Sequence, residues 1–484
     1  MTRFLSSLSQ NQRIFVSIAA GLFIALVMSF LTVFSVVIPA AVIVCSLFVV
    51  YIAYLFRDPS IGLNTLVVYC FTLSLFSREL SSAIPFGIGI EVFLLLIWIA
   101  VLILNKEFDW KSLNNDLVKL MLAWFIISFI EVINPAGASV RGWIQEIRST
   151  ALFPILSIPL AFLLFNSEKK LDTFLVIILL LSFFASLNGI KQQHIGLSDG
   201  EQRFLDEGGA VTHVLWGKLR VFSFYSEAGQ FGASQASFVL VALMLALGPF
   251  KIWKRILLFL LSIFFVYGML ISGTRGALFA LITGAFFAIF LTKNVKILSM
   301  GFIAALLFIF VLKFTSIGNG NYAIYRMRTG LDPQEASLNV RLNNQRVLSE
   351  YLRGRPFGGG LGVIGAWGKE YNKDKFLSTI EPDSYWVKLW AMYGIVGFTL
   401  WFCMIMYLLG KCCGIIWKIK SERLRYKAIA LISSSAGIFF CSYGNEVMNA
   451  MPSAIVVSFS FAFVFMCPKF DKEQELLVNN ELIT

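Results

Sequence analysis

The chain carries a succession of apolar runs between Ile14 and Cys467, separated by polar interruptions that are mostly short. A run of this kind is long enough to cross a bilayer, whose hydrocarbon core takes about 20 apolar residues in helical form. Because 58% of the residues are hydrophobic and only 14% are charged, no soluble globular fold accommodates this sequence. The runs therefore indicate a polytopic membrane protein.

These apolar runs predict an all-α fold. In lipid every backbone polar group needs a partner within the protein, and only helices or a closed barrel supply one. The runs do not alternate as barrel strands do, so we expect about 12–14 transmembrane helices. The expected spans lie near residues 14–32, 34–56, 62–77, 86–104, 117–134, 149–165, 172–190, 231–249, 256–272, 276–292, 297–315, 385–409, 427–443 and 452–467.

The chain is predicted to form a single membrane domain over residues 1–484, since no soluble domain, low-complexity tract or internal repeat interrupts the spans. Its largest polar insertion is residues 316–384, which we expect to form an outer loop with short helices. The tail of residues 470–484 is short and charged. We expect this tail to be disordered on the cytoplasmic side.

The basic residues of the short loops predict the orientation, because Lys and Arg are retained on the cytoplasmic side of a membrane. Alternate loops carry these residues, which makes both termini cytoplasmic. The loops 135–148, 191–230 and 316–384 then face outward, and long loops cross regardless of their charge. The basic set comprises Lys106, Lys111, Lys169, Lys170, Lys251, Lys254, Arg255, Lys293, Lys296, Lys411, Lys418, Lys420, Arg423, Arg425 and Lys427.

The cysteines and histidines do not form the pattern of a disulfide framework or a metal site. All seven cysteines fall inside expected spans or at the cytoplasmic rim, and His194 and His213 are the only two histidines. Two histidines that lie far apart, without neighbouring ligands, are typical of solvated or locally hydrogen-bonded side chains. We therefore expect no metal centre.

Every basic residue between Asn321 and Pro356 is an arginine. Guanidinium groups bind phosphate and carboxylate in a planar, bidentate manner. This part of the outer loop therefore predicts an anionic substrate at the membrane surface, with binding of anionic lipid headgroups as the alternative. The arginines are Arg326, Arg328, Arg341, Arg346, Arg353 and Arg355.

Two further polar motifs flank expected spans. The segment Ile271-Ser-Gly-Thr-Arg-Gly places Arg275 in a small-residue turn that suits a phosphate group. The alternative for Arg275 is a snorkelling arginine at a helix end. The segment from Arg220 to Glu227 combines aromatic residues with Arg and Glu, which suits recognition of a sugar. Its alternative is a set of interfacial anchors in which Glu227 favours a helix N-terminus.

The leucines from Ser337 to Leu352 follow a helical stripe and predict an amphipathic helix over the membrane mouth. This helix would aim Arg341 inward, whereas a solvated side chain is the alternative for Arg341 and the other arginines nearby. The turn that follows, Arg355-Pro-Phe-Gly-Gly-Gly-Leu-Gly, lets the backbone approach a phosphate or sugar closely. It lacks the Gly-Lys-Ser/Thr ending of a nucleotide-binding loop.

The segment Glu381-Pro-Asp-Ser-Tyr-Trp opens the expected span 385–409. Asp383 is placed there to accept a proton from an attacking sugar hydroxyl. The alternative is that Asp383 is the N-cap of the helix, which is a common stabilising role for Asp. The two roles are compatible.

The order of these motifs resembles the O-antigen ligase and O-antigen polymerase superfamily of bacterial envelope glycan assembly. The resemblance covers most of the chain, from the Arg220 segment and the Arg275 hairpin to a large outer loop. In that loop Arg341 precedes the glycine-rich turn, and a late span then carries Tyr393-Gly-Ile-Val-Gly.

The resemblance implies a glycosyltransferase of the bacterial inner membrane that needs no metal or cofactor. It implies transfer of a glycan from an undecaprenyl-diphosphate carrier to an acceptor glycan at the periplasmic face, in lipopolysaccharide O-antigen or surface polysaccharide synthesis. The acceptor would be lipid A core or a growing polysaccharide, membrane lipids would be further partners, and nucleic acid would not. The implied catalytic residues are Arg275, Arg341 and Asp383, and the implied substrate-binding residues are Arg220, Glu227, Arg346 and Arg355.

At one position the chain departs from the family pattern. Ligases of the family commonly carry His followed by Asn at the start of the late span, where this chain has Asp383 and Ser384. A carboxylate performs the same proton transfer, with Glu227 and Glu381 as alternative bases, and ligase and polymerase both stay open. A lipid-linked oligosaccharide flippase or other transporter is the alternative from another class. Charges deep in several spans would favour a transporter, and Glu91 is among few candidates.

Overall fold

The computed structural model describes residues 37–80, 85–104, 108–293, 336–382 and 384–483, with scattered positions between 303 and 328. This part of the chain is almost entirely helical. Its two short strands, Val214–Leu215 (β1) and Lys218–Leu219 (β2), pair antiparallel with Val214 opposite Leu219. The helices are α3 Val37–Arg57, α4 Pro59–Glu79, α5 Ile88–Ile103, α6 Asp116–Ile130, α7 Val140–Ile147, α8 Phe153–Leu164, α9 Glu168–His194, α10 Asp199–Phe204, α11 Ala210–His213, α12 Ala228–Leu247, α13 Ile252–Ile271, α14 Arg275–Thr292, α17 Ala336–Leu352, α18 Gly365–Tyr371, α19 Tyr385–Ile416, α20 Glu422–Cys441 and α21 Ser453–Ile483.

The prediction of an all-α polytopic membrane protein is confirmed. Within the described residues, nine helices are long and apolar enough to cross a membrane, and α5 is a shorter apolar helix. Each span that the sequence predicts in this part of the chain overlaps a helix. The expected span 14–32 lies outside the described residues, and so does most of 297–315.

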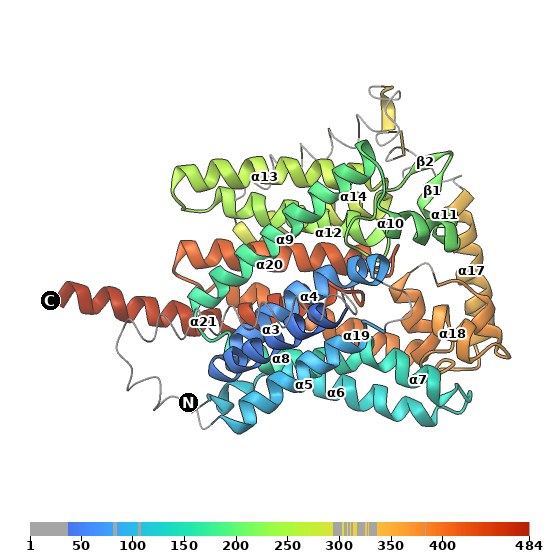
Figure 1. The fold of residues 1–484 in the computed structure, drawn as a ribbon, viewed down its shortest axis with the longest axis horizontal. Helices are drawn as coiled ribbons and strands as arrows, with labels where there is room; N and C mark the ends of the chain where they lie inside the picture. The colour runs from blue at the N-terminus through green and yellow to red at the C-terminus, as the bar shows by residue number, and fades with distance from the viewer. Residues whose placement is uncertain are drawn as a thin grey trace.

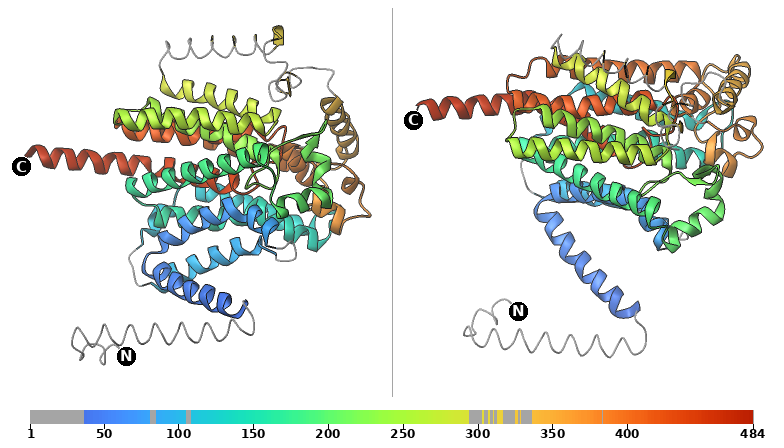
Figure 2. Two further views of the ribbon diagram at one scale, coloured as in Figure 1. Left: turned by 45° about the horizontal axis from the view of Figure 1, so that its top comes forward. Right: turned by 90° about the horizontal axis from the view of Figure 1, so that it is seen from above.

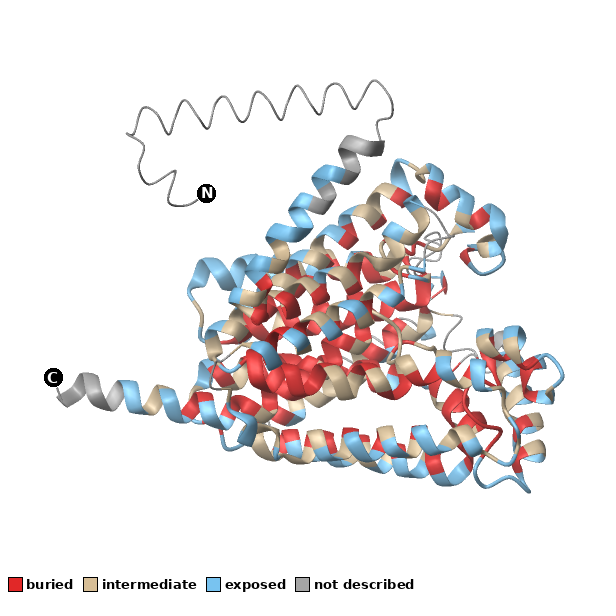
Figure 3. Cartoon of the chain, turned by 60° about the horizontal axis from the view of Figure 1, so that its bottom comes forward, coloured by how far each residue is buried: buried red, intermediate tan, exposed pale blue. Residues whose placement is uncertain are grey.

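The long helices run side by side along the longest axis of the molecule (Figure 1). Helices α12 and α20 form the centre of the bundle, where α12 packs against α13, α14 and α20. Buried residues concentrate in this centre, while the outer helices expose one face (Figure 3). Helix α3 stands at the edge of the bundle (Figure 2). An apolar exposed face on the outer helices is what a lipid environment requires.

Side-chain caps fix where several helices begin. The Asn115 side chain accepts a hydrogen bond from the backbone N–H of Val118 at the start of α6. Ser384 is the N-cap of α19, and its hydroxyl accepts a hydrogen bond from the backbone N–H of Val387 at 3.3 Å. The alternative that assigned this position to Asp383 was therefore wrong by one residue. Asp383 itself lies outside the described residues.

The glycine-rich turn after α17 packs on a kink in α19. Gly394, inside α19, has φ of +65°, a conformation that glycine adopts without strain. The turn lies against this kink, because the N–H of Gly359 donates to the carbonyl of Ala391 and that of Gly360 to Met392, both at 2.9 Å. The N–H of Val396 donates in turn to the carbonyl of Pro356 at 3.2 Å. The described glycines of this turn thus serve a close approach between two backbones.

The loops divide between two ends of the bundle. One end carries the basic loops, which are joined by ion pairs such as Lys170 to Asp58 at 3.3 Å and Lys427 to Glu168 at 2.7 Å. The other end carries α7, α10, α11, α17 and α18, at the right of Figure 1. This division agrees with the two sets of loops that the sequence separates.

The tail differs from its prediction. Helix α21 continues as one helix to Ile483 and extends beyond the bundle (Figures 1 and 2). Two causes are visible. The residues after Pro468 are mostly good helix formers such as Lys, Glu, Gln and Leu. In addition, the Asp471 carboxylate accepts the backbone N–H groups of Lys420 and Ser421, each at 2.9 Å, which anchors the helix to the preceding loop.

Candidate functional site

A cavity of about 590 Å³ opens at the end of the bundle that carries α17. Its walls come from the segment before α12, the turn between α13 and α14, helix α17, the approach to α19, and the loop between α20 and α21. Segments far apart in the sequence therefore meet here. The lining residues are Thr212, His213, Arg220, Ser226, Glu227, Ala228, Gly229, Thr274, Arg275, Gly276, Arg326, Arg341, Glu381, Pro382, Asn445, Glu446, Asn449 and Ala450.

Several residues singled out in the sequence are brought together in this cavity. Arg220, Arg275 and Arg341 all line it, and so do Glu227 and Glu381. They come from positions up to 161 residues apart in the chain (220 to 381). The cavity thus joins four separate motifs.

Two helix N-termini open into the same cavity. Its lining includes Ala228 and Gly229, the first residues of α12, and Arg275 and Gly276, the first residues of α14. The N-terminus of a helix carries partial positive charge and exposes backbone N–H groups. Together with the arginines these helix ends make the cavity suited to a phosphate or diphosphate group.

Arg220 is held between two of the contributing segments. One of its guanidinium nitrogens donates to the carbonyl of Thr212 at 2.9 Å, and the other donates to the Thr274 hydroxyl at 3.2 Å. The Thr274 hydroxyl lies 2.9 Å from the carbonyl oxygen of Ala228. These contacts fix the guanidinium relative to the starts of both α12 and α14.

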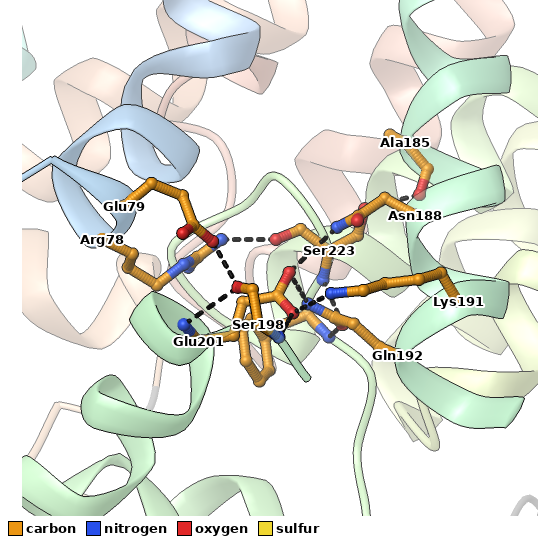
Figure 4. Close-up of polar contacts among 10 residues, drawn as sticks. Arg78, Glu79, Ala185, Asn188, Lys191, Gln192, Ser198, Glu201 and Ser223 are labelled. Carbon is orange, nitrogen blue, oxygen red and sulfur yellow. Dashed lines mark hydrogen bonds and ion pairs between the residues drawn. The ribbon is translucent and has the colours of Figure 1, made fainter. Parts of the chain in front are cut away.

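A buried polar network supports the segment that carries Arg220 and Glu227 (Figure 4). At its centre the Glu201 carboxylate accepts from Lys191 and Gln192, each at 2.8 Å. The Gln192 side-chain oxygen accepts in turn from the backbone N–H of Ser223 at 2.9 Å. Arg78 donates to the carbonyl of Tyr225 at 2.7 Å. Residues of α4, α9 and α10 thus hold the loop that forms one wall of the cavity.

The pKa of Glu201 reflects this network. Burial acts to raise the pKa of the Glu201 carboxyl, but the hydrogen bonds from Lys191, Ser198 and Gln192 outweigh it, so the pKa lies below its ordinary value. Glu201 is therefore ionised at neutral pH. It stabilises the loop as a charged acceptor.

Arg326 is a cavity residue to which the motif analysis gave no role in the site. It is buried, its Nε donates to the carbonyl of Gly273 at 2.5 Å, and its guanidinium lies 5.7 Å from the ring centre of Trp216. Gly273 has φ of +57°, and a Cβ there would lie 3.1 Å from the Cδ of Arg326. The sequence signal for Arg326 was that every basic residue between positions 321 and 356 is an arginine.

Glu446 is a second cavity residue that sequence reasoning missed. Its carboxylate lies 3.1 Å from the ammonium of Lys388, which lies 3.1 Å from Glu146 on its other side. Burial raises the pKa of Glu446, and the Lys388 charge opposes part of this shift. Lys388 lies inside an expected span, and an ionisable residue in a span was the available signal. Nothing in the spacing pointed to Glu146 or Glu446.

His213 lines the cavity as a neutral side chain. Its Nε2 accepts the backbone N–H of Ala228 at 3.2 Å, and its Nδ1 lies 2.9 Å from the carbonyl of Gly209. Burial lowers the pKa of His213 to about 4, although the Gly209 contact acts in the opposite direction. An imidazole that accepts at Nε2 carries its proton on Nδ1. His213 therefore links α11 to the start of α12.

Arg346 and Arg355 are not among the residues that line the cavity. Arg346 lies on α17 near Glu350, with a nitrogen to oxygen distance of 3.5 Å, and its side chain is 80% exposed. Arg355 packs over the ring of Tyr351 at 4.1 Å and donates to the carbonyl of the same residue at 3.0 Å.

Among the described residues, no group of three or more His, Cys, Asp or Glu is arranged to hold a metal ion.

The fold and the cavity together define a class: a polytopic helical membrane protein with an arginine-lined cavity at one end of its bundle. Residues 257–402 match the family model described as O-antigen ligase. This match confirms the resemblance to the O-antigen ligase and polymerase superfamily over that segment, and together with the membrane-length helices it supports an O-antigen ligase-type membrane protein. A comparison with curated proteins found no match.

The matched segment covers only part of the cavity. It runs from α13 into α19 and includes Arg275, Arg326 and Arg341. Arg220 and Glu227 precede it, and Glu446 follows it. The cavity is thus completed by residues on both sides of the matched segment.

Proposed function

We propose that this protein transfers a glycan from an undecaprenyl-diphosphate carrier to an acceptor glycan at the periplasmic face of the bacterial inner membrane. The observation that carries the proposal is the convergence of four arginines and two helix N-termini on one cavity. The match of residues 257–402 to O-antigen ligase supports the type of reaction. A cavity of about 590 Å³ also accommodates a diphosphate together with sugar units.

The arginines act on the donor. Arg220, Arg275, Arg326 and Arg341 bind the diphosphate and stabilise the charge that develops on it as the glycosidic bond breaks. The arrangement supplies positive charge from fixed guanidinium groups, so the reaction proceeds in the presence of a chelator. The released lipid diphosphate keeps the bonding electron pair.

A carboxylate acts on the acceptor. The acceptor hydroxyl oxygen forms a bond to the anomeric carbon of the donor, and its proton passes to a carboxylate. Asp383 is the first candidate, because in the sequence it stands between Pro382, which lines the cavity, and Ser384, which caps α19. Glu227, Glu381 and Glu446 line the cavity and are the alternatives. The raised pKa of Glu446 brings its proton affinity closer to the neutral range.

The test is transfer of a radiolabelled polyprenyl-diphosphate oligosaccharide by the purified full-length protein in EDTA. Separate reactions receive lipid A core or a repeat-unit glycan, because the acceptor consumed distinguishes ligase from polymerase. Arg341→Ala and Asp383→Asn are expected to abolish product. Arg353→Ala is the matched control, since this arginine is exposed beyond the end of α17 and does not line the cavity.

Two outcomes contradict the proposal. One is that Arg341→Ala and Asp383→Asn retain transfer at the level of the Arg353→Ala control, which would show that the cavity does not take part in the reaction. The other is no transfer with any acceptor, together with movement of labelled lipid across proteoliposome bilayers, which would establish a flippase. Glu91, the carboxylate within a span that would favour a transporter, forms an ion pair with Arg148.

The orientation is part of the proposal. The cavity end faces the periplasm and the end with the basic loops faces the cytoplasm, in line with the retention of Lys and Arg inside. Reporter fusions after Lys373, between α18 and α19, and after Thr484 test this assignment. A periplasm-active reporter is expected to work at the first site and a cytoplasm-active reporter at the second. The reverse result would show that the cavity end faces the cytoplasm.

A further inference from the structure

A second cavity of about 550 Å³ lies between α9 and α13, away from the arginine-lined cavity. Its walls are apolar, with Leu175 and Leu179 on α9 facing Leu257 and Leu261 on α13. Leu245, near the end of α12, closes it from the inside. We call this cavity the α9–α13 groove.

The α9–α13 groove lies at the end of the bundle that carries the basic loops. It is lined by residues 172–183 of α9 and 253–261 of α13, whereas the last turns of both helices lie toward the opposite end of the bundle. Along α13 it extends from Trp253 to Leu261, which corresponds to about 12 Å of helix. One leaflet of the hydrocarbon core is about 15 Å deep. The groove therefore matches the depth of an acyl chain in that leaflet.

Cationic side chains gather at the polar mouth of the groove. Lys254 packs over the ring of Trp253 at 5.4 Å, and Arg423 lies 5.4 Å from the ring centre of Phe250. Lys427 is buried below them and is 2.7 Å from Glu168. The charges of Lys254 and Arg423 thus lie where a lipid headgroup would sit.

One carboxylate at the mouth is shared among these cations. Asp172 contacts Lys427 and also lies 3.8 Å from Arg423. The three cations Lys254, Arg423 and Lys427 outnumber the two carboxylates Asp172 and Glu168, so the mouth keeps a net positive charge of one. A positive mouth above an apolar groove is complementary to a phospholipid whose headgroup carries a net negative charge.

We propose that the α9–α13 groove binds one anionic phospholipid, with an acyl chain between α9 and α13 and the headgroup phosphate at Lys254 and Arg423. The apolar walls alone would accept the chain of any phospholipid. The two cations select for a net negative headgroup, and Arg423 contributes a planar pair of donors to a phosphate. This binding site is separate from glycan transfer and does not depend on it.

The test uses full-length protein in detergent and native mass spectrometry with two lipids of identical acyl chains, phosphatidylglycerol and phosphatidylcholine. Wild-type protein is expected to retain one phosphatidylglycerol with about fivefold preference, as a net charge of one near a membrane surface provides. The Lys254→Gln/Arg423→Gln variant is expected to lose the preference while it still takes up either lipid weakly.

The matched control is Lys169→Gln/Lys418→Gln. Both lysines are exposed at the same end of the bundle and neither lines the groove, so the net charge changes equally while the mouth stays intact. The control is expected to keep the preference for phosphatidylglycerol. Equal retention of the two lipids by wild type, or an equal loss in the control, would overturn the proposal.

A third variant tests the apolar part. Val176 lines the groove and its side chain is 55% exposed, so a larger residue there fills the groove without disturbing the bundle centre. Val176→Trp is expected to lose bound phosphatidylglycerol although both cations remain. Undiminished binding in Val176→Trp would place the lipid elsewhere, and thermal unfolding of all variants verifies that they are folded.

Discussion

The ammonium of Lys388 and the carboxylate of Glu446 lie 3.1 Å apart beneath the arginine-lined cavity. Lys388 comes from the first turn of α19 and Glu446 from the loop between α20 and α21, and Lys388 also contacts Glu146 of α7. Side-chain exposure is 9% for Lys388 and 1% for Glu146. One buried lysine therefore ties three separate segments together at the floor of the site.

We predict that Lys388→Met strongly destabilises the protein. Removal of the ammonium leaves Glu146 buried without its counter-charge, and breaking a buried ion pair in this way costs about 3–5 kcal/mol. The measurement is thermal unfolding in detergent. Lys411→Met is the control, because the pair of Lys411 with Asp116 is 46% and 36% exposed and an exposed ion pair contributes little to stability.

A double variant makes this prediction sharper. Lys388→Met/Glu146→Leu removes the unpaired carboxylate along with the lysine, so it is expected to recover part of the lost stability. If the double variant is no more stable than Lys388→Met, the loss does not arise from the buried charge.

Gly394→Ala is predicted to disrupt the contact between α19 and the glycine-rich turn. A Cβ at position 394 would overlap the carbonyl of Pro356 and the backbone nitrogen of Gly358, and the φ of +65° is unfavourable for any side chain. A loss of at least about 2 kcal/mol is expected, read as a lower unfolding temperature. Gly410→Ala in the same helix is the control, because no neighbouring atom lies within 4 Å of an added Cβ there; equal behaviour of the two variants would contradict the packing role.

Arg326→Ala is predicted to lower glycan transfer about 10²–10³-fold, the typical effect of losing one fixed donor that stabilises developing charge. Arg326→Lys is expected to restore only part of the rate, because the ammonium keeps the charge but loses the planar donor fork. The measurement is the initial rate with the labelled donor, and Arg353→Ala serves as the exposed-arginine control. An Arg326→Ala rate within a factor of about three of the control would show that Arg326 does not contribute to glycan transfer.

His213 is predicted to make the protein less stable at acidic pH. Its pKa in the folded protein, about 4, lies below the ordinary value of 6.5, so its contribution is complete above pH 6.5 and is lost as the pH falls towards 4. At about 1.4 kcal/mol for each pKa unit, the loss amounts to about 3 kcal/mol at most.

The measurement for His213 is the unfolding temperature between pH 7 and pH 4. His213→Gln is expected to flatten this dependence relative to wild type. His194→Gln is expected to leave it unchanged, because His194 is exposed. A wild-type profile that runs parallel to that of His213→Gln would exclude the buried imidazole as the cause.

Much of the site was predictable from local sequence. Arg220 and Arg275 each stand in a short polar segment close to a long apolar run, and this contrast marks residues at a membrane surface. Arg341 stood out as an arginine on the predicted amphipathic helix of the large outer loop. Their shared cavity agrees with the order of motifs from which the family resemblance was drawn. Arg326 was visible as one of several arginines, but no local property set it apart from Arg346.

Other parts of the site depend on contacts between distant segments. Lys388 and Glu446 are 58 positions apart, and no spacing rule links an ionisable residue in a span to a loop carboxylate that far away. From the sequence, the glycine-rich turn predicts a backbone that approaches a phosphate or sugar, because glycine permits close approach to any partner. Only the folded chain shows that this partner is the kink at Gly394.

Local sequence accounts for the membrane class, the all-helical fold and the positions of the membrane spans, because the bilayer imposes one length and one polarity on every span. It also determined which loops are basic. The tertiary structure alone decided which arginines line the cavity, which remain on the surface and which carboxylates join them. The physical reason is that spans are fixed by residues next to one another in the chain, whereas a site is fixed by how helices pack, and packing depends on all the side chains in contact.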